Sequence, residues 1–337
     1  MKAALLTEPS KISISDMPMP VCGDGQVLVK ISHVGICGTD TKIFDGGIPS
    51  NMPLVMGHEA VGEIVEGQAE DGSSPGDPVI IDPVLHCGNC FYCDKGDTHL
   101  CENGGLVGRE VDGVFAEYFL APAGNVFALG TKIDRAAAPL IQVMTTVLHA
   151  QNRAKIQTGE VVVVLGLGVT GLLQIQVAKA LGAKVVIGVS RNAYKRGLAD
   201  KMGADVTAEH GEDAKQKVLE LTEGRGADVV IEAVGYISVL AEAMDIARIG
   251  GRIIPFGIYA ALEGKLPFYQ FYFKELNIIN ARAALPSDFP ACIKLVEEGK
   301  VDLGPFITHT YSLDELSEAI KHLMAPSDER LKVILEV

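Results

Sequence analysis

The sequence lacks any run of about 18 consecutive apolar residues, the length that a helix needs to cross a bilayer. It also lacks an excess of positive charge, because 43 acidic residues against 29 basic ones give a net charge of −14. Nucleic acids and anionic membrane surfaces are therefore poor partners. The start, Met1–Leu6, is followed at once by Thr7, Glu8 and Pro9, which leaves it too short for a signal-peptide core. We therefore expect a cytoplasmic protein whose cysteines are reduced.

Internal repeats and low-complexity segments are also absent, and the 337 residues suggest about two domains. The first third has short β-like runs separated by glycine and proline, which predict an irregular all-β unit. These runs are Gln26–Ile31, Ala60–Val65, Val79–Ile81 and Phe115–Leu120.

The pattern changes after a helix that we predict over Ala136–Ala154. Continuous apolar runs then alternate with helical stretches, which predicts a parallel sheet covered by helices on both faces. Six strands are the number that a complete dinucleotide-binding fold uses. The predicted strands are Val161–Leu165, Val185–Val189, Asp205–Ala208, Asp228–Ile231, Arg252–Phe256 and Leu276–Ile279.

The tail after Asn280 predicts two helices, Asp288–Glu298 and Leu313–Leu323, and a final strand, Leu331–Glu336. We expect this tail to return to the first domain. The prediction is an α/β protein with a β-rich domain over 1–150, completed by 281–337, and a doubly wound domain over 151–280.

A glycine-rich turn follows the first predicted strand of the doubly wound domain. Gly166 permits a tight turn, Gly168 lets a pyrophosphate approach the backbone, and Gly171 lets helix and strand pack closely. An incidental glycine turn is the alternative, which the strand before and the helix after disfavour. The predicted cofactor loop comprises Gly166, Leu167, Gly168, Val169, Thr170 and Gly171.

The end of the second strand of this domain carries no carboxylate. NAD-binding domains usually place Asp or Glu there to hold the ribose hydroxyls, whereas this chain has Ser190 and Arg191. A hydroxyl and a guanidinium suit a 2′-phosphate, so we favour NADP over NAD. The alternative is a solvated basic turn at a helix start.

Four of the seven cysteines, Cys87, Cys90, Cys93 and Cys101, fall within fifteen residues. Four thiolates can close a tetrahedral shell around a structural Zn²⁺. In a reducing compartment this interpretation is favoured over two disulfides or four idle thiols. His86, beside Cys87, is an alternative ligand.

A second group of metal-ligand residue types is dispersed over Cys37, His58 and Glu59. An open catalytic zinc site needs about three protein donors, and all three residue types are competent. Taken singly, each has an ordinary structural explanation, since a lone cysteine is often a small buried hydrophobe.

Taken in order, these motifs resemble those of the zinc-containing medium-chain dehydrogenase/reductases, the family of alcohol, sorbitol and threonine dehydrogenases. The resemblance covers essentially the whole chain, and the polyol and sugar dehydrogenase branch is the most similar. The matching segments are Gly35–Asp40, Gly57–Glu59, the four-cysteine segment, Gly113–Tyr118, the glycine loop and Thr308–His309.

The resemblance implies a GroES-like catalytic domain and a Rossmann domain. Cys37 and His58 match catalytic zinc ligands, and Glu59 matches a residue that contacts the zinc directly or through another ligand. Gln142 stands where polyol dehydrogenases carry a glutamate, so the third ligand is either Glu59 or Gln142. Thr39, two residues after Cys37, is placed for a proton relay.

On the cofactor side, the resemblance places Lys195 near the adenosine half, and Val234, Phe256 and Arg282 near the nicotinamide half. It also implies a homodimer or a homotetramer. We therefore expect a zinc enzyme that transfers a hydride between NADP(H), or NAD(H), and a polyol, sugar or secondary alcohol. The alternatives are an amino-alcohol (threonine-like) or simple alcohol dehydrogenase and, outside enzymes, a nucleotide-binding structural or sensor protein.

Overall fold

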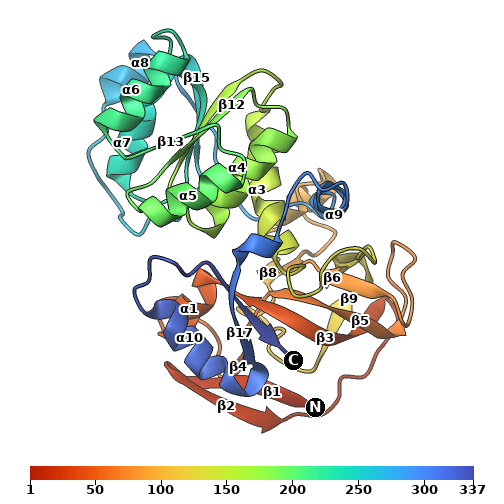
Figure 1. Ribbon diagram of the computed structural model, residues 1–337. Coiled ribbons are helices and arrows are strands. Elements are labelled where there is room, and N and C mark those ends of the chain that lie inside the picture. The colour runs from red at the N-terminus through yellow and green to blue at the C-terminus, as the bar shows by residue number, and fades with distance from the viewer. The chain divides into compact units, whose positions relative to one another are not determined.

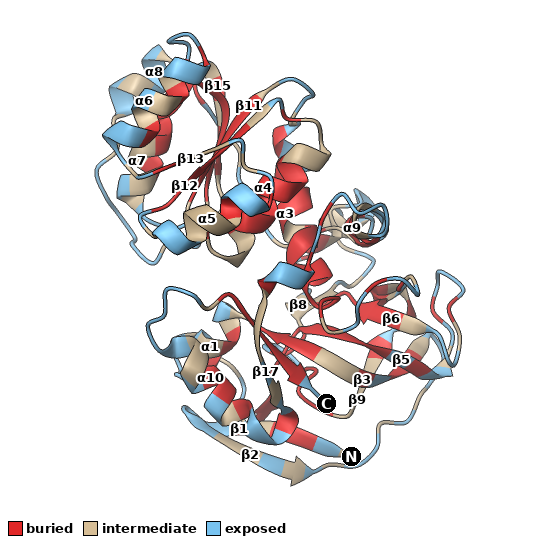
Figure 2. Cartoon of the chain, in the orientation of Figure 1, coloured by how far each residue is buried: buried red, intermediate tan, exposed pale blue.

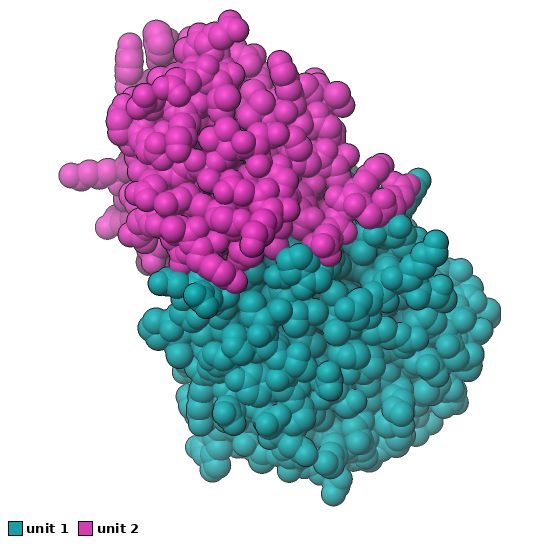
Figure 3. All heavy atoms as spheres, in the orientation of Figure 1, with its two compact units in different colours: residues 1–145, 283–297, 303–337 teal, residues 146–282, 298–302 magenta.

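The computed structural model describes all 337 residues, which form two compact units. Unit 1 comprises residues 1–145, 283–297 and 303–337, and unit 2 comprises residues 146–282 and 298–302 (Figure 3). No helix combines the length and the apolar character that crossing a membrane requires. The domain boundaries at 150 and 280 stay a prediction, because compactness alone does not show which segments fold independently.

Unit 2 is a six-stranded parallel sheet in the order β13-β12-β11-β14-β15-β16, with helices on both faces (Figure 1). The order reverses between β11 and β14, as in a doubly wound dinucleotide-binding sheet. The strands are β11 (Val161–Leu165), β12 (Val185–Val189), β13 (Val206–Ala208), β14 (Ala227–Glu232), β15 (Ala247–Pro255) and β16 (Asn277–Ile278). The helices are the end of α3 (Leu140–Ala154), α4 (Val169–Ala180), α5 (Ala193–Lys201), α6 (Glu212–Leu221), α7 (Ile237–Ile246) and α8 (Phe268–Phe273).

The central strands of this sheet are buried on both faces, as their continuous apolar sequence predicts. Every residue of β11 and of β14 is buried, and Figure 2 shows the middle of the sheet in the colour of buried residues. The predicted sheet is confirmed, and the ends of β11 and β12 agree with the prediction to the residue.

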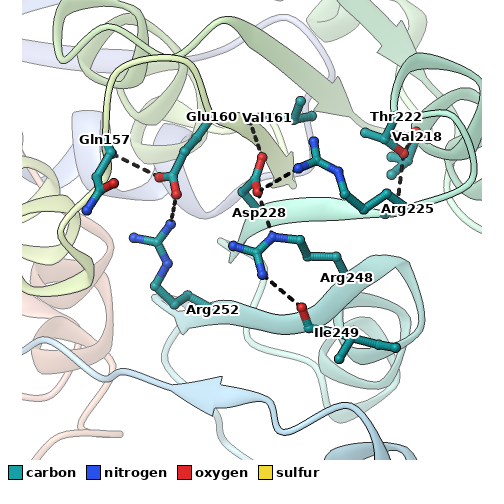
Figure 4. Close-up of polar contacts among 11 residues, drawn as sticks. Gln157, Glu160, Val161, Val218, Thr222, Arg225, Asp228, Arg248, Ile249 and Arg252 are labelled. Carbon is teal, nitrogen blue, oxygen red and sulfur yellow. Dashed lines mark hydrogen bonds and ion pairs between the residues drawn. The ribbon is translucent and has the colours of Figure 1, made fainter.

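An ionic network lies at the amino ends of the strands of this sheet (Figure 4). The Asp228 carboxylate accepts hydrogen bonds from the backbone N–H of Val161 at 2.8 Å and from Arg248 Nε at 2.6 Å. Arg225 lies 3.5 Å from the same carboxylate, and Arg252 pairs with Glu160. The amide of Val161 and the Arg248 guanidinium contribute to lowering the pKa of Asp228, although its partial burial opposes that shift. The network therefore stabilises the pairing of β11 with β14 where both strands begin.

Unit 1 is β-rich. Its largest sheet has the order β10-β6-β5-β3-β18-β17, with β9 also paired to β3, and a separate sheet has the order β2-β1-β4. The tail returns to this unit as predicted, because β18 pairs with β3. The hairpin β1–β2 and the strand β17 were not predicted.

The strands of unit 1 are β1 (Lys2–Glu8), β2 (Lys11–Asp16), β3 (Gln26–Ile36), β4 (Leu54–Val55), β5 (Glu59–Gly67), β6 (Pro78–Ile81), β7 (Val84–Leu85), β8 (Gly105–Leu106), β9 (Tyr118–Pro122), β10 (Val126–Ala128), β17 (Ile307–Ser312) and β18 (Lys332–Glu336). Its helices are α1 (Gly38–Phe44), α2 (Phe91–Asp94), the start of α3, α9 (Asp288–Glu297) and α10 (Leu316–Met324). With unit 2, these elements give the predicted fold class, a β-rich unit and a doubly wound sheet.

Candidate active site and cofactor-binding residues

Strand pairing in unit 1 brings the dispersed ligand residues together. β3 runs antiparallel to β5 with Gly35 opposite Glu59, so the end of β3 meets the start of β5. Cys37 follows β3 directly, and His58 and Glu59 stand at the start of β5. The ligand atoms of Cys37, His58 and Glu59 lie within 4.8 Å of one another.

The turn before His58 requires a glycine. Gly57 has φ +93°, and a Cβ on it would lie 2.7 Å from the ring of the fully buried Phe115. Any larger residue would therefore strain this turn and collide with Phe115.

Asp40 links the two ligand segments and was missed by the sequence analysis. One oxygen of its fully buried carboxylate accepts the backbone N–H of Cys37 at 2.8 Å, and the other lies 3.3 Å from Nδ1 of His58. Burial opposes a charge on His58, but the Asp40 carboxylate outweighs it and raises the pKa of His58 well above its usual value. Because Nδ1 faces Asp40, Nε2 is the nitrogen left for a metal.

Glu59 is engaged by a second residue that the sequence analysis missed. Lys332, at the start of β18, forms a buried ion pair with the Glu59 carboxylate. A Cβ on Gly35 would overlap both side chains, so the glycine makes room for this pair. Residues 59 and 332 meet because β5 and β18 flank β3, which spacing along the sequence does not indicate.

The four cysteines form a second cluster, at the loops around α2, which we call the cysteine lobe (Cys87, Cys90, Cys93 and Cys101). Neighbouring sulfur atoms are 3.5 to 3.8 Å apart, and all four lie within 4.8 Å of one another. All are free thiols. Hydrogen bonds from the backbone N–H groups of Cys93 and Glu102 are the main reason that the pKa of the Cys90 thiol is lowered to about 6.

The donor sets of both clusters fit zinc. Four sulfurs at about 2.3 Å from a tetrahedral Zn²⁺ are about 3.8 Å apart, close to the spacing in the cysteine lobe. The set of Cys37, His58 and Glu59 mixes soft and hard donors, as open zinc sites do.

The glycine loop has the geometry that a dinucleotide needs. Gly166 has φ +97°, and a Cβ on Gly171 would overlap the carbonyl oxygen of Gly166. At Gly168, by contrast, φ is −76° and a Cβ would meet nothing within 4 Å. Since the protein itself leaves room there, the space before the amino end of α4 suits a ligand, and the free amides of that helix end favour an anion.

Comparison with known proteins identifies the family. Residues 23–131 match the model described as "Alcohol dehydrogenase GroES-like domain", and residues 169–298 match "Zinc-binding dehydrogenase". The chain is 33% identical over 341 residues to a sorbitol dehydrogenase of Halalkalibacterium halodurans, with 99% of each chain covered. It is also 33% identical over 350 residues to an L-threonine 3-dehydrogenase of Pyrococcus horikoshii, covering 100% of this chain and 99% of the relative. A zinc-binding dehydrogenase of Sinorhizobium meliloti 1021, solved bound to NADP, superimposes with a TM-score of 0.91 at 31% identity, with 100% and 99% of the chains covered.

The chain belongs to the zinc-binding alcohol dehydrogenase family.

This dehydrogenase is therefore an NAD(P)-dependent zinc enzyme, as the sequence predicts. The two remaining residues of the predicted zinc site, Thr39 and Gln142, lie at helix starts in unit 1. Thr39 is half-buried in the first turn of α1, and Gln142 is buried in the first turn of α3. Their predicted roles stay predictions.

Ser190 and Arg191, which the sequence predicts for the adenosine half of the cofactor, follow β12. Ser190 is buried, and its carbonyl accepts a hydrogen bond from Arg196 Nη1 at 2.6 Å. The same guanidinium pairs with Glu209 at 2.9 Å, so Arg196 fixes this turn. Arg191 is exposed, and Lys195 lies in the first turn of α5, where its amide donates to Asn192.

On the other side of the glycine loop, Val234 follows β14 and Phe256 follows β15. Val234 lies against the loop, because a Cβ on Gly166 would be 2.5 Å from its Cγ2. Phe256 donates its amide to the carbonyl of Glu232 at 2.8 Å, which brings these two segments together. Arg282, also a predicted cofactor-binding residue, is exposed and is the last residue of the segment 146–282 of unit 2.

Proposed function

We propose that this dehydrogenase interconverts a polyol, sugar or other secondary alcohol and its carbonyl compound with NADP(H) as the hydride carrier. The observation that carries the proposal is the convergence of Cys37, His58 and Glu59, whose ligand atoms lie within 4.8 Å of one another. The relatives support the substrate class, since one is named a sorbitol dehydrogenase and another an L-galactonate-5-dehydrogenase. The similarity to L-threonine 3-dehydrogenases keeps an amino alcohol as the second candidate.

Cys37 and His58 would hold the catalytic zinc, with Glu59 or Gln142 as the third donor. Glu59 lies with them within 4.8 Å, whereas its ion pair with Lys332 already compensates its charge, which favours the neutral Gln142. When bound, zinc supplies Lewis acidity toward the substrate oxygen. The Asp40 carboxylate orients the His58 ring, and the Thr39 hydroxyl passes the substrate proton toward solvent.

The cysteine lobe would hold a second, structural zinc with all four thiolates, which leaves no position for substrate. The cofactor would lie across the glycine loop with its pyrophosphate at the amino end of α4. Ser190 and the exposed Arg191 would bind the 2′-phosphate, because no carboxylate at the end of β12 repels it.

We also propose that the dehydrogenase is a homo-oligomer that associates through α8 and β16. The aromatic side chains Phe268, Tyr269, Tyr272 and Phe273 of α8 are all at least 60% exposed, and β16 is the last strand of its sheet. A second copy related by a two-fold axis would cover both features. Light scattering that gives a monomer mass would contradict this assembly.

The test of the function is reduction of NADP⁺, with NAD⁺ in parallel, by the zinc-loaded protein across polyols, aldoses, secondary alcohols and amino alcohols. We expect turnover with a polyol or sugar and a preference for NADP⁺. Fastest turnover with threonine would favour the amino-alcohol alternative, and no turnover with any compound would contradict the proposal.

Arg191→Gln separates the two cofactors. Loss of a charge-assisted contact to the 2′-phosphate should raise KM for NADP⁺ about 10- to 100-fold and leave KM for NAD⁺ unchanged. Lys184→Gln removes an exposed cation at the amino end of β12 and should change neither value. Equal effects of Arg191→Gln on both cofactors would contradict the 2′-phosphate assignment.

A further inference from the structure

Glu232, the last residue of β14, carries a buried carboxylate that has no cationic partner. Its side chain has no exposed surface. One oxygen accepts the backbone N–H groups of Val234 and Gly235, each at 2.8 Å, and the other accepts the Tyr259 hydroxyl at 2.5 Å. All three donors are neutral, whereas buried carboxylates are usually compensated by a cation. The three hydrogen bonds hold the carboxylate in place, but no positive charge within the unit compensates it.

Glu232 lies beside the glycine loop. In the pairing of β14 with β11, Glu232 stands opposite Leu165, the residue before Gly166, and the amide of Ala233 donates to the Leu165 carbonyl at 2.8 Å. The strand order of the sheet reverses between these two strands. Ligands of such sheets bind outside the carboxyl ends of the strands at this point.

Glu232 also joins two segments at the carboxyl ends of the strands, residues 233–235 after β14 and residues 256–259 after β15. The Glu232 carbonyl accepts the amides of Phe256 at 2.8 Å and Gly257 at 2.9 Å, while its side chain reaches Tyr259. Gly235 has φ +87°, and a Cβ on it would lie 2.6 Å from the carbonyl oxygen of Ile258. Through Glu232, the two segments form one continuous surface next to the glycine loop.

This surface lies where a dinucleotide-binding sheet would hold the second half of its cofactor. A dinucleotide-binding sheet has two mononucleotide halves. The first half, at β12, offers Ser190 and Arg191 for the adenosine part, so the second half, at β14 and β15, is left for the nicotinamide. The oxidised nicotinamide ring carries a formal positive charge, and the reduced ring is neutral. A buried, uncompensated anion nearby therefore interacts more favourably with the oxidised ring.

Resting on the proposed function, we propose that Glu232 is a positioning residue for the nicotinamide half of the cofactor and that its negative charge favours the oxidised form. Tyr259 is the tether of the second segment. Burial and the Glu232 charge raise the pKa of the Tyr259 hydroxyl, so it stays a donor at every working pH.

The experiment measures dissociation constants of NADP⁺ and NADPH, and of NAD⁺ and NADH, by calorimetry for the zinc-loaded protein and two variants. Glu232→Gln keeps the shape and removes the charge, so it should weaken binding of the oxidised cofactor about tenfold relative to the reduced one. Tyr259→Phe keeps the charge and removes the tether. It should weaken both forms alike and lower kcat.

Asp228→Asn is the matched control, because it neutralises a buried carboxylate near the opposite end of the same strand, β14. It should lower stability without changing the ratio of the two dissociation constants. An unchanged ratio in Glu232→Gln, or the same change in Asp228→Asn, would overturn the inference. Absence of binding of every cofactor to the unmodified protein would instead contradict the proposed function.

Discussion

The two groups of metal-ligand residues in unit 1 are built in opposite ways. In the cysteine lobe, four identical ligands lie within fifteen residues, and glycines with positive φ, Gly88 and Gly96, let the local loop fold around them. In the Cys37–His58–Glu59 site, different ligands come from separate strands, and the buried charges of Asp40 and Lys332 hold them.

This contrast separates a loop whose shape depends on a metal from a site whose shape the fold imposes. The loop from Cys87 to Cys101 contains no strand and is closed only at its base, by the pairing of β7 with β8. Four thiolates in this loop would repel one another without a metal. Cys37 and His58, by comparison, are fixed by the pairing of β3 with β5. Loss of a ligand should therefore act on stability in the first case and on chemistry in the second.

The largest expected effect is that of Cys37→Ala. It removes a ligand from the site that the fold holds, so kcat should fall at least about a thousandfold while thermal unfolding stays close to that of the unmodified protein. Steady-state kinetics and calorimetry measure the two quantities. Cys22→Ala, a thiol outside both clusters, is the control and should change neither. Retained turnover in Cys37→Ala would refute the assignment of the catalytic zinc.

Lys332→Met tests whether buried charges hold the catalytic site. Removing one partner of a buried ion pair leaves Glu59 uncompensated, so the free energy of unfolding should fall by about 3–5 kcal/mol. Adding Glu59→Gln to this variant should recover much of the loss, because the uncompensated charge is then gone. If the double variant is as unstable as the sum of the single ones, the ion pair does not couple these residues. Denaturant unfolding gives the free energy of unfolding of the unmodified protein, of the two single variants and of the double variant.

Cys90→Ser tests the opposite property of the cysteine lobe. Bound zinc should fall from two ions per chain to one, and the unfolding midpoint should drop by at least about 5 °C because the loop loses its metal. At low temperature, where the variant stays folded, its kcat should equal that of the unmodified protein. An unchanged midpoint together with two zinc ions per chain would mean that three thiolates and another ligand, such as His86, suffice.

The same contrast explains how much of the molecule the sequence predicts. The cysteine lobe and the glycine loop are local patterns, and β11 and β12 are continuous apolar runs, so their positions follow from spacing alone. Lys332 and Asp40 were missed because each acts through a partner far away in the sequence, at Glu59 and His58. The hairpin β1–β2 was missed since Ala3–Leu6 is a short apolar run without the alternation that marks a half-buried strand.

The smallest expected effect concerns Asp82, which anchors the base of the cysteine lobe. Its buried carboxylate accepts the backbone N–H of Val84 at 2.9 Å, at the start of the segment that leads to Cys87. Burial, reinforced by the charge of Asp288, raises the pKa of Asp82 from 3.8 to about 7. Between these two values the folded protein binds a proton that the unfolded chain does not. The stability from Asp82 is therefore complete below pH 3.8 and is lost as the pH rises toward 7.

Asp82→Asn removes this dependence while its amide oxygen can still accept the Val84 N–H. Relative to the variant, the unmodified protein should lose on the order of 1 kcal/mol of unfolding free energy per pH unit between about pH 5 and 7. Denaturant unfolding at several pH values measures this difference, and Asp24→Asn, at an exposed carboxylate, is the control that should track the unmodified protein. A difference that does not vary with pH would show that Asp82 is ionised throughout. The base of the lobe would then be held by a charge that the fold compensates, as the catalytic site is, and the contrast between the two sites would be confined to the four thiols.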